Sequence, residues 1–167
     1  MKGLSDDPSS RMLIRPAGKH DVGIILGFIK ELAEYERLAH EVVNDEASLN
    51  HFLFGEHRAA EAIIAELNET PVGFALFFHT FSTFLGKPGL YLEDLYVKPN
   101  MRGQGFGRRL LHHVARLALE RGCGRLEWSV LDWNKSAIGF YEKLGAQAMD
   151  GWTVYRLTDD NLDAFGK

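Results

Sequence analysis

Apolar residues recur at helical spacing in four parts of the chain. The first helix is expected to begin after Asp21, a residue that can cap a helix, and it carries Val22, Ile25, Ile29 and Leu32 on one face. A shorter helix is predicted within residues 44–57, and an amphipathic helix follows residue 107. A last short helix is predicted within residues 134–146, where Gly145 provides a stop.

Strand patterns fill most of the remaining chain. They cover residues 11–17, 60–67, 72–81, 90–97, 125–131 and 151–158. A turn at residues 68–71 joins the second and third strands into a hairpin, and a loop is expected at residues 82–89. Strands that pack against helices in this way predict a layered α/β (α+β) architecture.

Length and composition indicate one ordinary globular domain. The chain has 167 residues, of which 46% are hydrophobic and 25% charged. We expect a disordered tail over residues 1–11 and a single domain over residues 12–167. The formal charge of -4 argues against broad nucleic-acid binding and leaves room for a cationic partner. The single cysteine, Cys123, and the lack of a signal peptide or long apolar run predict a cytoplasmic protein without a membrane span.

The glycine-rich stretch "RGQGFG", residues 102–107, leaves a predicted strand and opens a helix. Glycines let a ligand approach the backbone, and the N–H groups at a helix start favour an anion. Three arginines, Arg102, Arg108 and Arg109, add positive charge, so the loop predicts a pyrophosphate cradle. A glycine-rich turn with solvated arginines is the plain alternative. The stretch is not a P-loop, because it lacks the Gly-Lys-Ser/Thr sequence of that motif. It also departs from the dinucleotide-binding motif G-x-G-x-x-G, because Arg108 occupies the position of the third glycine.

The loop and a second motif carry a family resemblance. "VKPNMRGQGFGRRLL" resembles the R/Q-x-x-G-x-G/A loop of the GNAT N-acetyltransferases, matched by Arg102, Gly105 and Gly107. "WNKSAIGFYEKLGA" resembles their N-x-x-A-x-x-F-Y segment, and "LIRPA" their opening strand. Segments such as "FIKELAEYE", "YLEDLYV", "LDWN" and "DGW" resemble the diamine (spermidine/spermine) acetyltransferases, especially the thialysine acetyltransferase branch.

The resemblance implies acetyl-CoA as co-substrate and a mostly antiparallel mixed sheet. That sheet would splay between the strand carrying Glu93 and the strand at residues 125–131. The backbone of Leu95, Tyr96 and Val97 would pair with the pantetheine arm, and the loop N–H groups would hold the pyrophosphate. The remaining residues expected to bind the cofactor are Arg102, Gly103, Gln104, Gly105, Phe106, Gly107, Arg108, Asn134, Lys135, Ser136 and Ala137. The relatives are dimers, so a homodimer is expected.

Acetyl transfer to an amine needs a base and a group that meets the departing thiolate. A lysine-like amine is free base in only about one molecule in a few thousand at pH 7, so a carboxylate helps to bind it and remove its proton. The resemblance favours Glu93 as this base. Asp94 follows it, and regular strand geometry predicts that the two point to opposite faces. The resemblance assigns Tyr141 as general acid. Asn134 lies seven residues earlier, which would place both on one helical face.

The resemblance also places an acceptor pocket for a small amine. An aromatic ring and a carboxylate suit an ammonium group, and Ser82 and Thr83 favour a short acceptor over a long polyamine. The residues expected to line it are Tyr35, Glu36, Ser82, Thr83, Glu93, Asp94, Glu127, Trp128 and Ser129. The plain alternatives are solvated carboxylates, a solvated helix end and a core tyrosine. No histidine pair has metal-ligand spacing with an acidic partner, so no metal is expected.

We therefore predict direct acetyl transfer, in a ternary complex, from acetyl-CoA to a primary amine. The acceptor would be thialysine, a lysine-like amino acid or a short diamine or polyamine. The alternatives are a protein or peptide amine acetyltransferase, a catalytically silent CoA-binding module and, remotely, a dinucleotide oxidoreductase. No nucleic acid or membrane partner is expected.

Overall fold

The computed structural model of the protein describes residues 12–167. These residues form two compact units, one that ends at Ser129 and one that comprises Val130–Lys167, and each is described by itself. The expected tail, residues 1–11, lies outside the described residues. The single domain expected over residues 12–167 stays a prediction.

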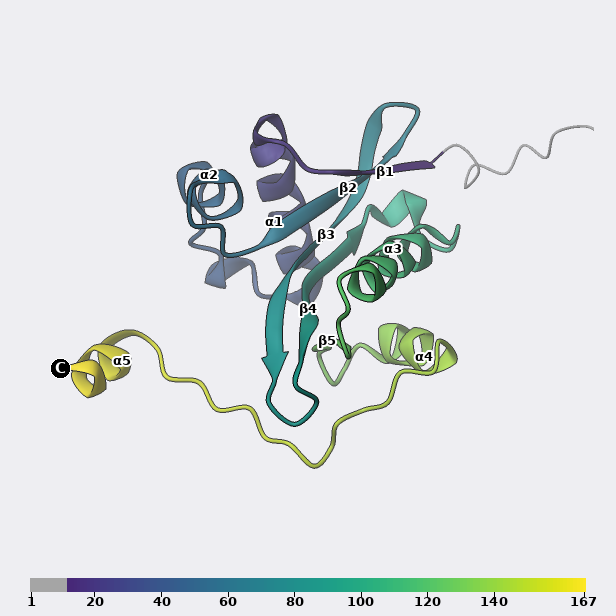
Figure 1. Ribbon diagram of the computed structural model, residues 1–167. Coiled ribbons are helices and arrows are strands. Elements are labelled where there is room, and N and C mark those ends of the chain that lie inside the picture. The colour runs from purple at the N-terminus through teal and green to yellow at the C-terminus, as the bar shows by residue number, and fades with distance from the viewer. Residues whose placement is uncertain (1–11) are drawn as a thin grey trace, which may run out of the picture. The chain divides into compact units, whose positions relative to one another are not determined.

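The first unit is built on one mixed sheet of five strands (Figure 1). The strands lie in chain order and are β1 (Met12–Pro16), β2 (Glu61–Leu67), β3 (Thr70–Ser82), β4 (Lys87–Val97) and β5 (Leu126–Trp128). Neighbours from β1 to β4 pair antiparallel, and β5 pairs parallel with β4. The expected α+β class with a mostly antiparallel sheet is confirmed.

Helices cover both faces of this sheet. Helices α1 (Val22–Glu36) and α2 (Glu46–Phe54) lie on one face and α3 (Phe106–Glu120) lies on the other (Figure 1). Short 3₁₀ turns are η2 (Lys19–Asp21), η3 (Ala39–Glu41) and η4 (Pro99–Met101). The second unit contains α4 (Lys135–Lys143) and α5 (Asp159–Gly166).

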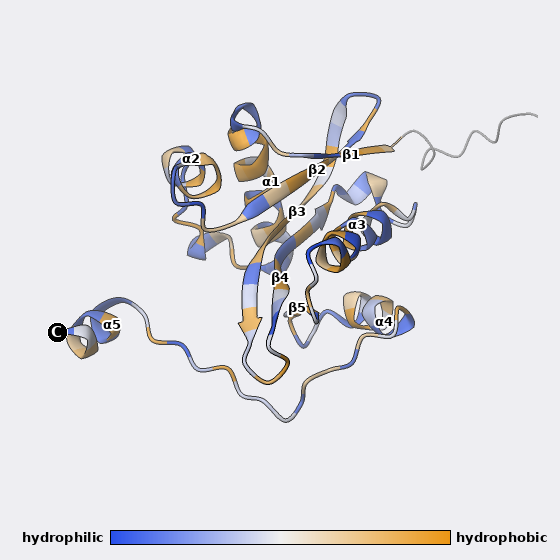
Figure 2. Ribbon diagram, viewed as in Figure 1, coloured by the Kyte–Doolittle hydropathy of each residue, from blue (hydrophilic) through white to orange (hydrophobic). Residues whose placement is uncertain are grey.

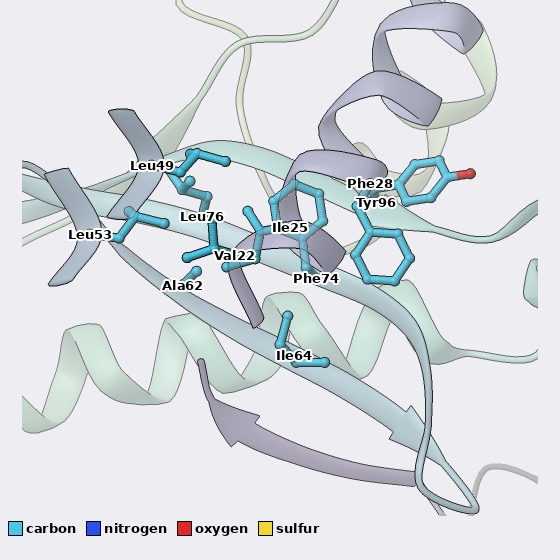
Figure 3. Packing of buried hydrophobic residues seen from close by; sticks show 10 residues of the cluster. All are labelled: Val22, Ile25, Phe28, Leu49, Leu53, Ala62, Ile64, Phe74, Leu76 and Tyr96. Carbon is cyan, nitrogen blue, oxygen red and sulfur yellow. The ribbon is translucent and has the colours of Figure 1, made fainter. Parts of the chain in front are cut away.

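The main hydrophobic core lies between the sheet and helices α1 and α2 (Figure 3). Phe28 of α1 stacks on Phe74 of β3 with 5.6 Å between ring centroids, and Ile25 and Ile64 are fully buried beside them. Each such side chain stabilises the fold by roughly 1.5–3 kcal/mol. Figure 2 shows the central strands largely orange, whereas α3 carries both orange and blue positions. The apolar stripe of α3 packs on the sheet through Leu110, Leu111, Val114 and Ala118.

The β3–β4 hairpin is longer than the sequence predicts. The ladder runs to Ser82↔Lys87, so the expected loop at residues 82–89 shrinks to a turn at residues 83–86. Pro88 and Gly89 have low strand propensity, which is why the sequence predicts a loop. In the structure they stand in register with Phe81 and Thr80 of β3 and continue the strand. Tertiary pairing here overrides local preference.

Two sequence expectations are wrong. Residues 151–158 form no strand, although Trp152, Val154 and Tyr155 have strand-like composition, because no strand of the described chain pairs with them and all three are exposed. Asp21 does not cap α1 with its side chain. Its carboxylate instead accepts hydrogen bonds from the Gly18 N–H and from Arg15.

Within residues 12–167, none of the helices combines the length and apolarity needed to cross a bilayer.

Candidate active site

Glu93 is the extra residue of a β-bulge in β4. The register pairs Leu76 with Asp94 and Phe77 with Leu92, so Glu93 has no partner of its own in β3. A bulge bends the strand and re-aims side chains, which interrupts the regular alternation. The prediction that Glu93 and Asp94 point to opposite faces depends on regular alternation, and the bulge interrupts that alternation at Glu93. Glu93 is exposed and Asp94 is partly buried.

Three carboxylates gather where β4 passes the end of α1. We call Glu36, Glu93 and Asp94 the acidic cluster. Burial, and then the negative charges of Glu93 and Glu36, raise the pKa of the Asp94 carboxyl to about 7. Burial also raises the pKa of Glu36. Because the charges of Glu93 and Glu36 contribute to the raised pKa of Asp94, a cation placed among these carboxylates would be stabilised.

Arg102 connects the glycine loop to the end of α1. Its guanidinium carbon lies 4.4 Å from the centroid of the Tyr35 ring and 5.6 Å from that of Tyr96. Its Nε donates to the Val97 carbonyl at 2.9 Å. The Tyr96 hydroxyl donates to Glu31 at 2.7 Å, and burial followed by this hydrogen bond raises the pKa of Tyr96 to about 12. The candidate acceptor residue Tyr35 therefore contacts the candidate cofactor loop.

The glycine loop has the backbone geometry of an anion site. Gly103 and Gly105 adopt φ values of 75° and 83°, the left-handed region that favours glycine, and Gly105 caps the N-terminus of α3. A side chain at either position would meet open space, so the approach to the backbone is clear. The first N–H groups of α3, from Phe106 onward, have no partner within the helix. These features fit a diphosphate such as that of CoA.

The β4–β5 ladder is short. It consists of the pairs Leu90↔Leu126, Tyr91↔Glu127 and Leu92↔Trp128, whereas β4 continues to Val97. The pantetheine residues expected on the sequence, Leu95, Tyr96 and Val97, thus follow the last pair. Tyr96 and Val97 bury their side chains, so only backbone groups of this stretch could pair with a ligand, and the Val97 carbonyl already accepts from Arg102.

The other expected acceptor residues of the first unit lie on or just after β5, where Trp128 pairs with Leu92 beside Glu93, or at the turn end of the β3–β4 hairpin. Glu127 pairs with Arg125 at 2.7 Å, and the Ser129 hydroxyl is hydrogen-bonded to that of Tyr91 at 2.6 Å. Ser82 is buried at the turn end of the hairpin, where its Oγ accepts from the Leu85 N–H. Its partner Lys87 lies six positions before Glu93 on β4, or roughly 20 Å along the strand. Within one chain, the structure does not bring Ser82 and its neighbour Thr83 to Glu93.

The second unit carries the candidate acid. Tyr141 lies on α4, half-buried, with its ring 5.3 Å from that of Phe140. Asn134 is not in the helix but is its N-cap, and its Oδ1 accepts from the Ala137 N–H at 3.2 Å. The expectation that Asn134 and Tyr141 project from one helical face is therefore wrong, because the cap residue folds its amide back onto the helix. Lys135, Ser136 and Ala137 form the first turn of α4.

Sequence reasoning missed Glu31 and the bulge. Glu31 lies one helical turn before Tyr35, a spacing that by itself does not indicate a role in the site. Its role follows from the hydrogen bond that it accepts from the Tyr96 hydroxyl. The bulge has no glycine to mark it. In residues 12–167, no group of three or more His, Cys, Asp or Glu side chains has an arrangement that could hold a metal ion.

Residues 25–146 match the acetyltransferase (GNAT) family. The chain is 42% identical to the thialysine N-epsilon-acetyltransferase of Bos taurus, with 90% of this chain and 95% of that protein covered. It is 33% identical to the L-ornithine N5-acetyltransferase of Arabidopsis thaliana, with 92% and 87% covered. Among solved structures, it resembles an integron cassette protein from the mobile metagenome of V. cholerae at 30% identity and a TM-score of 0.77, with 94% of this chain and 98% of that one covered.

Proposed function

We propose an acceptor and a mechanism on the premise that the chain belongs to the acetyltransferase (GNAT) family and is an N-acetyltransferase with acetyl-CoA as its co-substrate. The acceptor is the side-chain amine of thialysine or a similar lysine-like or ornithine-like amino acid, or one end of a short diamine. The acetyl group passes directly from the thioester to this amine in a ternary complex.

One observation carries this proposal: the acidic cluster lies beside an aromatic ring that contacts the cofactor loop. Burial raises the pKa of Asp94, the charges of Glu93 and Glu36 add to this effect, and Arg102 lies over Tyr35. Carboxylates attract an ammonium group, and an aromatic face adds a cation–π contribution. A small cation bound there would lie close to the loop proposed to hold the CoA diphosphate. The names of the relatives, which act on thialysine and L-ornithine, agree with a short amine of this kind.

Proton removal is the main obstacle, because the amine reaches the enzyme as an ammonium ion. We assign Glu93 as the base, acting directly or through one water. Its place in the bulge leaves it exposed to a ligand, while Asp94 and Glu36 hold the positive charge near it. Tyr141 is proposed to donate a hydrogen bond or a proton to the thiolate of the departing CoA. A homodimer and a cytoplasmic location stay predictions.

The experiment is an amine panel with CoA thiol release as the readout. Thialysine, lysine, ornithine, putrescine and spermidine are compared at fixed acetyl-CoA. We expect the short amino-acid and diamine acceptors to have the highest kcat/KM. Glu93→Gln is expected to lower kcat by about 100-fold or more while CoA still binds, since general base catalysis contributes that much. Glu36→Gln should chiefly raise KM for the amine.

Glu34→Gln is the matched control, because Glu34 is an exposed glutamate on the same helix as Glu36. It should leave both constants unchanged. An unchanged kcat in Glu93→Gln with every amine would remove Glu93 from the mechanism. Turnover of none of these amines would overturn the proposed acceptor class.

A further inference from the structure

A basic groove lies between β1 and α3 in the first unit. It encloses about 430 Å³, and five of its six lining residues are basic. The lining consists of Ile14, Arg108, Arg109, His112, His113 and Arg116. No carboxylate belongs to this lining, although the chain as a whole carries a net charge of -4.

Helical spacing explains why these side chains collect. Arg109, His113 and Arg116 follow one another at four and three residues, so they lie on one side of α3. The apolar stripe of the same helix is buried against the sheet, which leaves the basic side chains at its margin.

Acidic neighbours neutralise little of this charge. Arg116 pairs with Glu120 at 3.2 Å, but both side chains are more than half exposed, so the pair contributes little. Arg109 donates to a neutral group, the Met12 carbonyl, at 3.0 Å. Burial and then the charge of Arg116 lower the pKa of His113. The groove is thus a place where an anion would find cations without a strong partner.

We propose that this groove binds a small, multiply charged phosphate anion other than CoA, at a site that adjoins the glycine loop through Arg108. Guanidinium groups bind phosphate oxygens in pairs of parallel hydrogen bonds, which favours phosphate over a single carboxylate. The groove covers only the stretch of α3 from Arg108 to Arg116, whereas nucleic acid needs a longer basic surface. The inference rests on the proposed function in one respect, because it takes the glycine loop as the binding site for the diphosphate of CoA.

Two sources of the phosphate are distinguished by experiment. The proposed anion is a free polyphosphate, and the alternative outcome is that the groove receives the phosphates of CoA itself. Inorganic pyrophosphate is titrated calorimetrically into the full-length chain, first alone and then saturated with CoA. We expect pyrophosphate to bind with similar affinity in both cases. Loss of pyrophosphate binding in the CoA-saturated protein would show that both ligands share one site and would overturn the proposal.

Variants locate the site. Arg116→Gln combined with His113→Gln is expected to weaken pyrophosphate binding by about tenfold or more, because charge-assisted hydrogen bonds are lost. Arg58→Gln is the matched control, since Arg58 is an exposed arginine on the segment between α2 and β2. Equal weakening in both variants would mean unspecific charge attraction and would overturn the proposal, as would unchanged binding in the double variant.

The same preparations are assayed for amine acetylation and thermal unfolding. Retained turnover in the double variant, with an unchanged melting temperature, would show that the groove and the acetyl-transfer site are independent. Absence of acetylation in the wild-type chain would count against the proposed function and not against the groove, because pyrophosphate binding is measured without an acceptor.

Discussion

The guanidinium of Arg102 lies over the ring of Tyr35, 4.4 Å from its centroid. This contact joins the loop proposed to bind CoA to the helix end proposed to bind the amine. Replacing Arg102 with Gln removes a cation–π contact of about 0.5–2 kcal/mol. We expect KM to rise for both substrates, by about 2- to 30-fold, as measured by steady-state kinetics.

Variants of the aromatic partner separate the ring from its hydroxyl. Tyr35→Phe keeps the ring and should behave as wild type towards acetyl-CoA, whereas Tyr35→Leu should raise KM for acetyl-CoA as Arg102→Gln does. If Tyr35→Leu changes KM for the amine alone, the contact does not couple the two sites.

The left-handed backbone of Gly105 predicts a sharp sensitivity to a side chain. Gly105→Ala places a Cβ at φ 83°, which costs roughly 1–2 kcal/mol of strain. We expect a lower free energy of unfolding in urea and a weaker affinity for CoA by calorimetry. Gly27→Ala is the control, because Gly27 lies inside α1 with no atom near an added Cβ. There the same change should stabilise the protein by about 0.5–1 kcal/mol.

The raised pKa of Asp94 predicts a stability that falls as the pH rises. The folded protein holds a proton on Asp94 up to pH about 7, while the unfolded chain releases it near its ordinary value of 3.8. The folded state therefore binds more protons between these values, and this contribution is lost as pH rises through 7. Its slope is at most about 1.4 kcal/mol per pH unit. Urea unfolding from pH 4 to pH 8 measures it.

Asp94→Asn removes this slope and is expected to be more stable than wild type at pH 8. Glu36→Gln, which keeps Asp94, should move the pH range over which stability falls to lower pH. It removes one of the charges that raise the pKa of Asp94. Identical pH profiles of wild type and Asp94→Asn would contradict the assignment.

The ion pair of Arg15 with Asp21 predicts a large loss of stability. Asp21 is fully buried and accepts two hydrogen bonds from the Arg15 guanidinium, at 2.7 and 2.9 Å. Breaking a buried pair costs about 3–5 kcal/mol, and we expect Asp21→Asn near the lower value because Glu66 still pairs with Arg15. Urea unfolding at pH 7 measures this loss.

Asp163→Asn, at an exposed position of α5, is the control and should change little. The hydrogen bonds from Arg15 lower the pKa of Asp21, so its contribution is present above about pH 4 and is lost as the pH falls through the folded value. Retained stability of wild type well below that pH would argue against a dominant role for this pair.

The sequence predicts most of this fold because its signals are local. The apolar spacing of α1 and α3, the stop at Gly145 and the turn at residues 68–71 each depend on a few neighbouring residues. Long-range pairing is what it fails to reveal. The strand expected at residues 151–158 lacks a partner in the described chain, and the bulge at Glu93 exists only relative to β3.

The candidate site follows the same rule. The glycine loop can be predicted from the sequence because Gly103 and Gly105 both adopt the left-handed backbone conformation that favours glycine. The stacking of Arg102 on Tyr35 joins residues 67 positions apart, and no spacing rule predicts it. The sequence predicts that Asn134 shares a helical face with Tyr141, but its role as a cap depends on where α4 begins.

Within the described residues, β5 pairs with β4 at only three positions, so the end of β4 from Glu93 to Val97 has no strand beside it on that edge of the sheet. Unpaired strand edges elsewhere invite aggregation, and proteins usually shield them. Here a substrate that completes the hydrogen-bond pattern would also act as a folding aid, stabilising the native state in proportion to the logarithm of its concentration. The concentration of acetyl-CoA would then affect the fraction of the protein that is folded as well as the rate of acetylation.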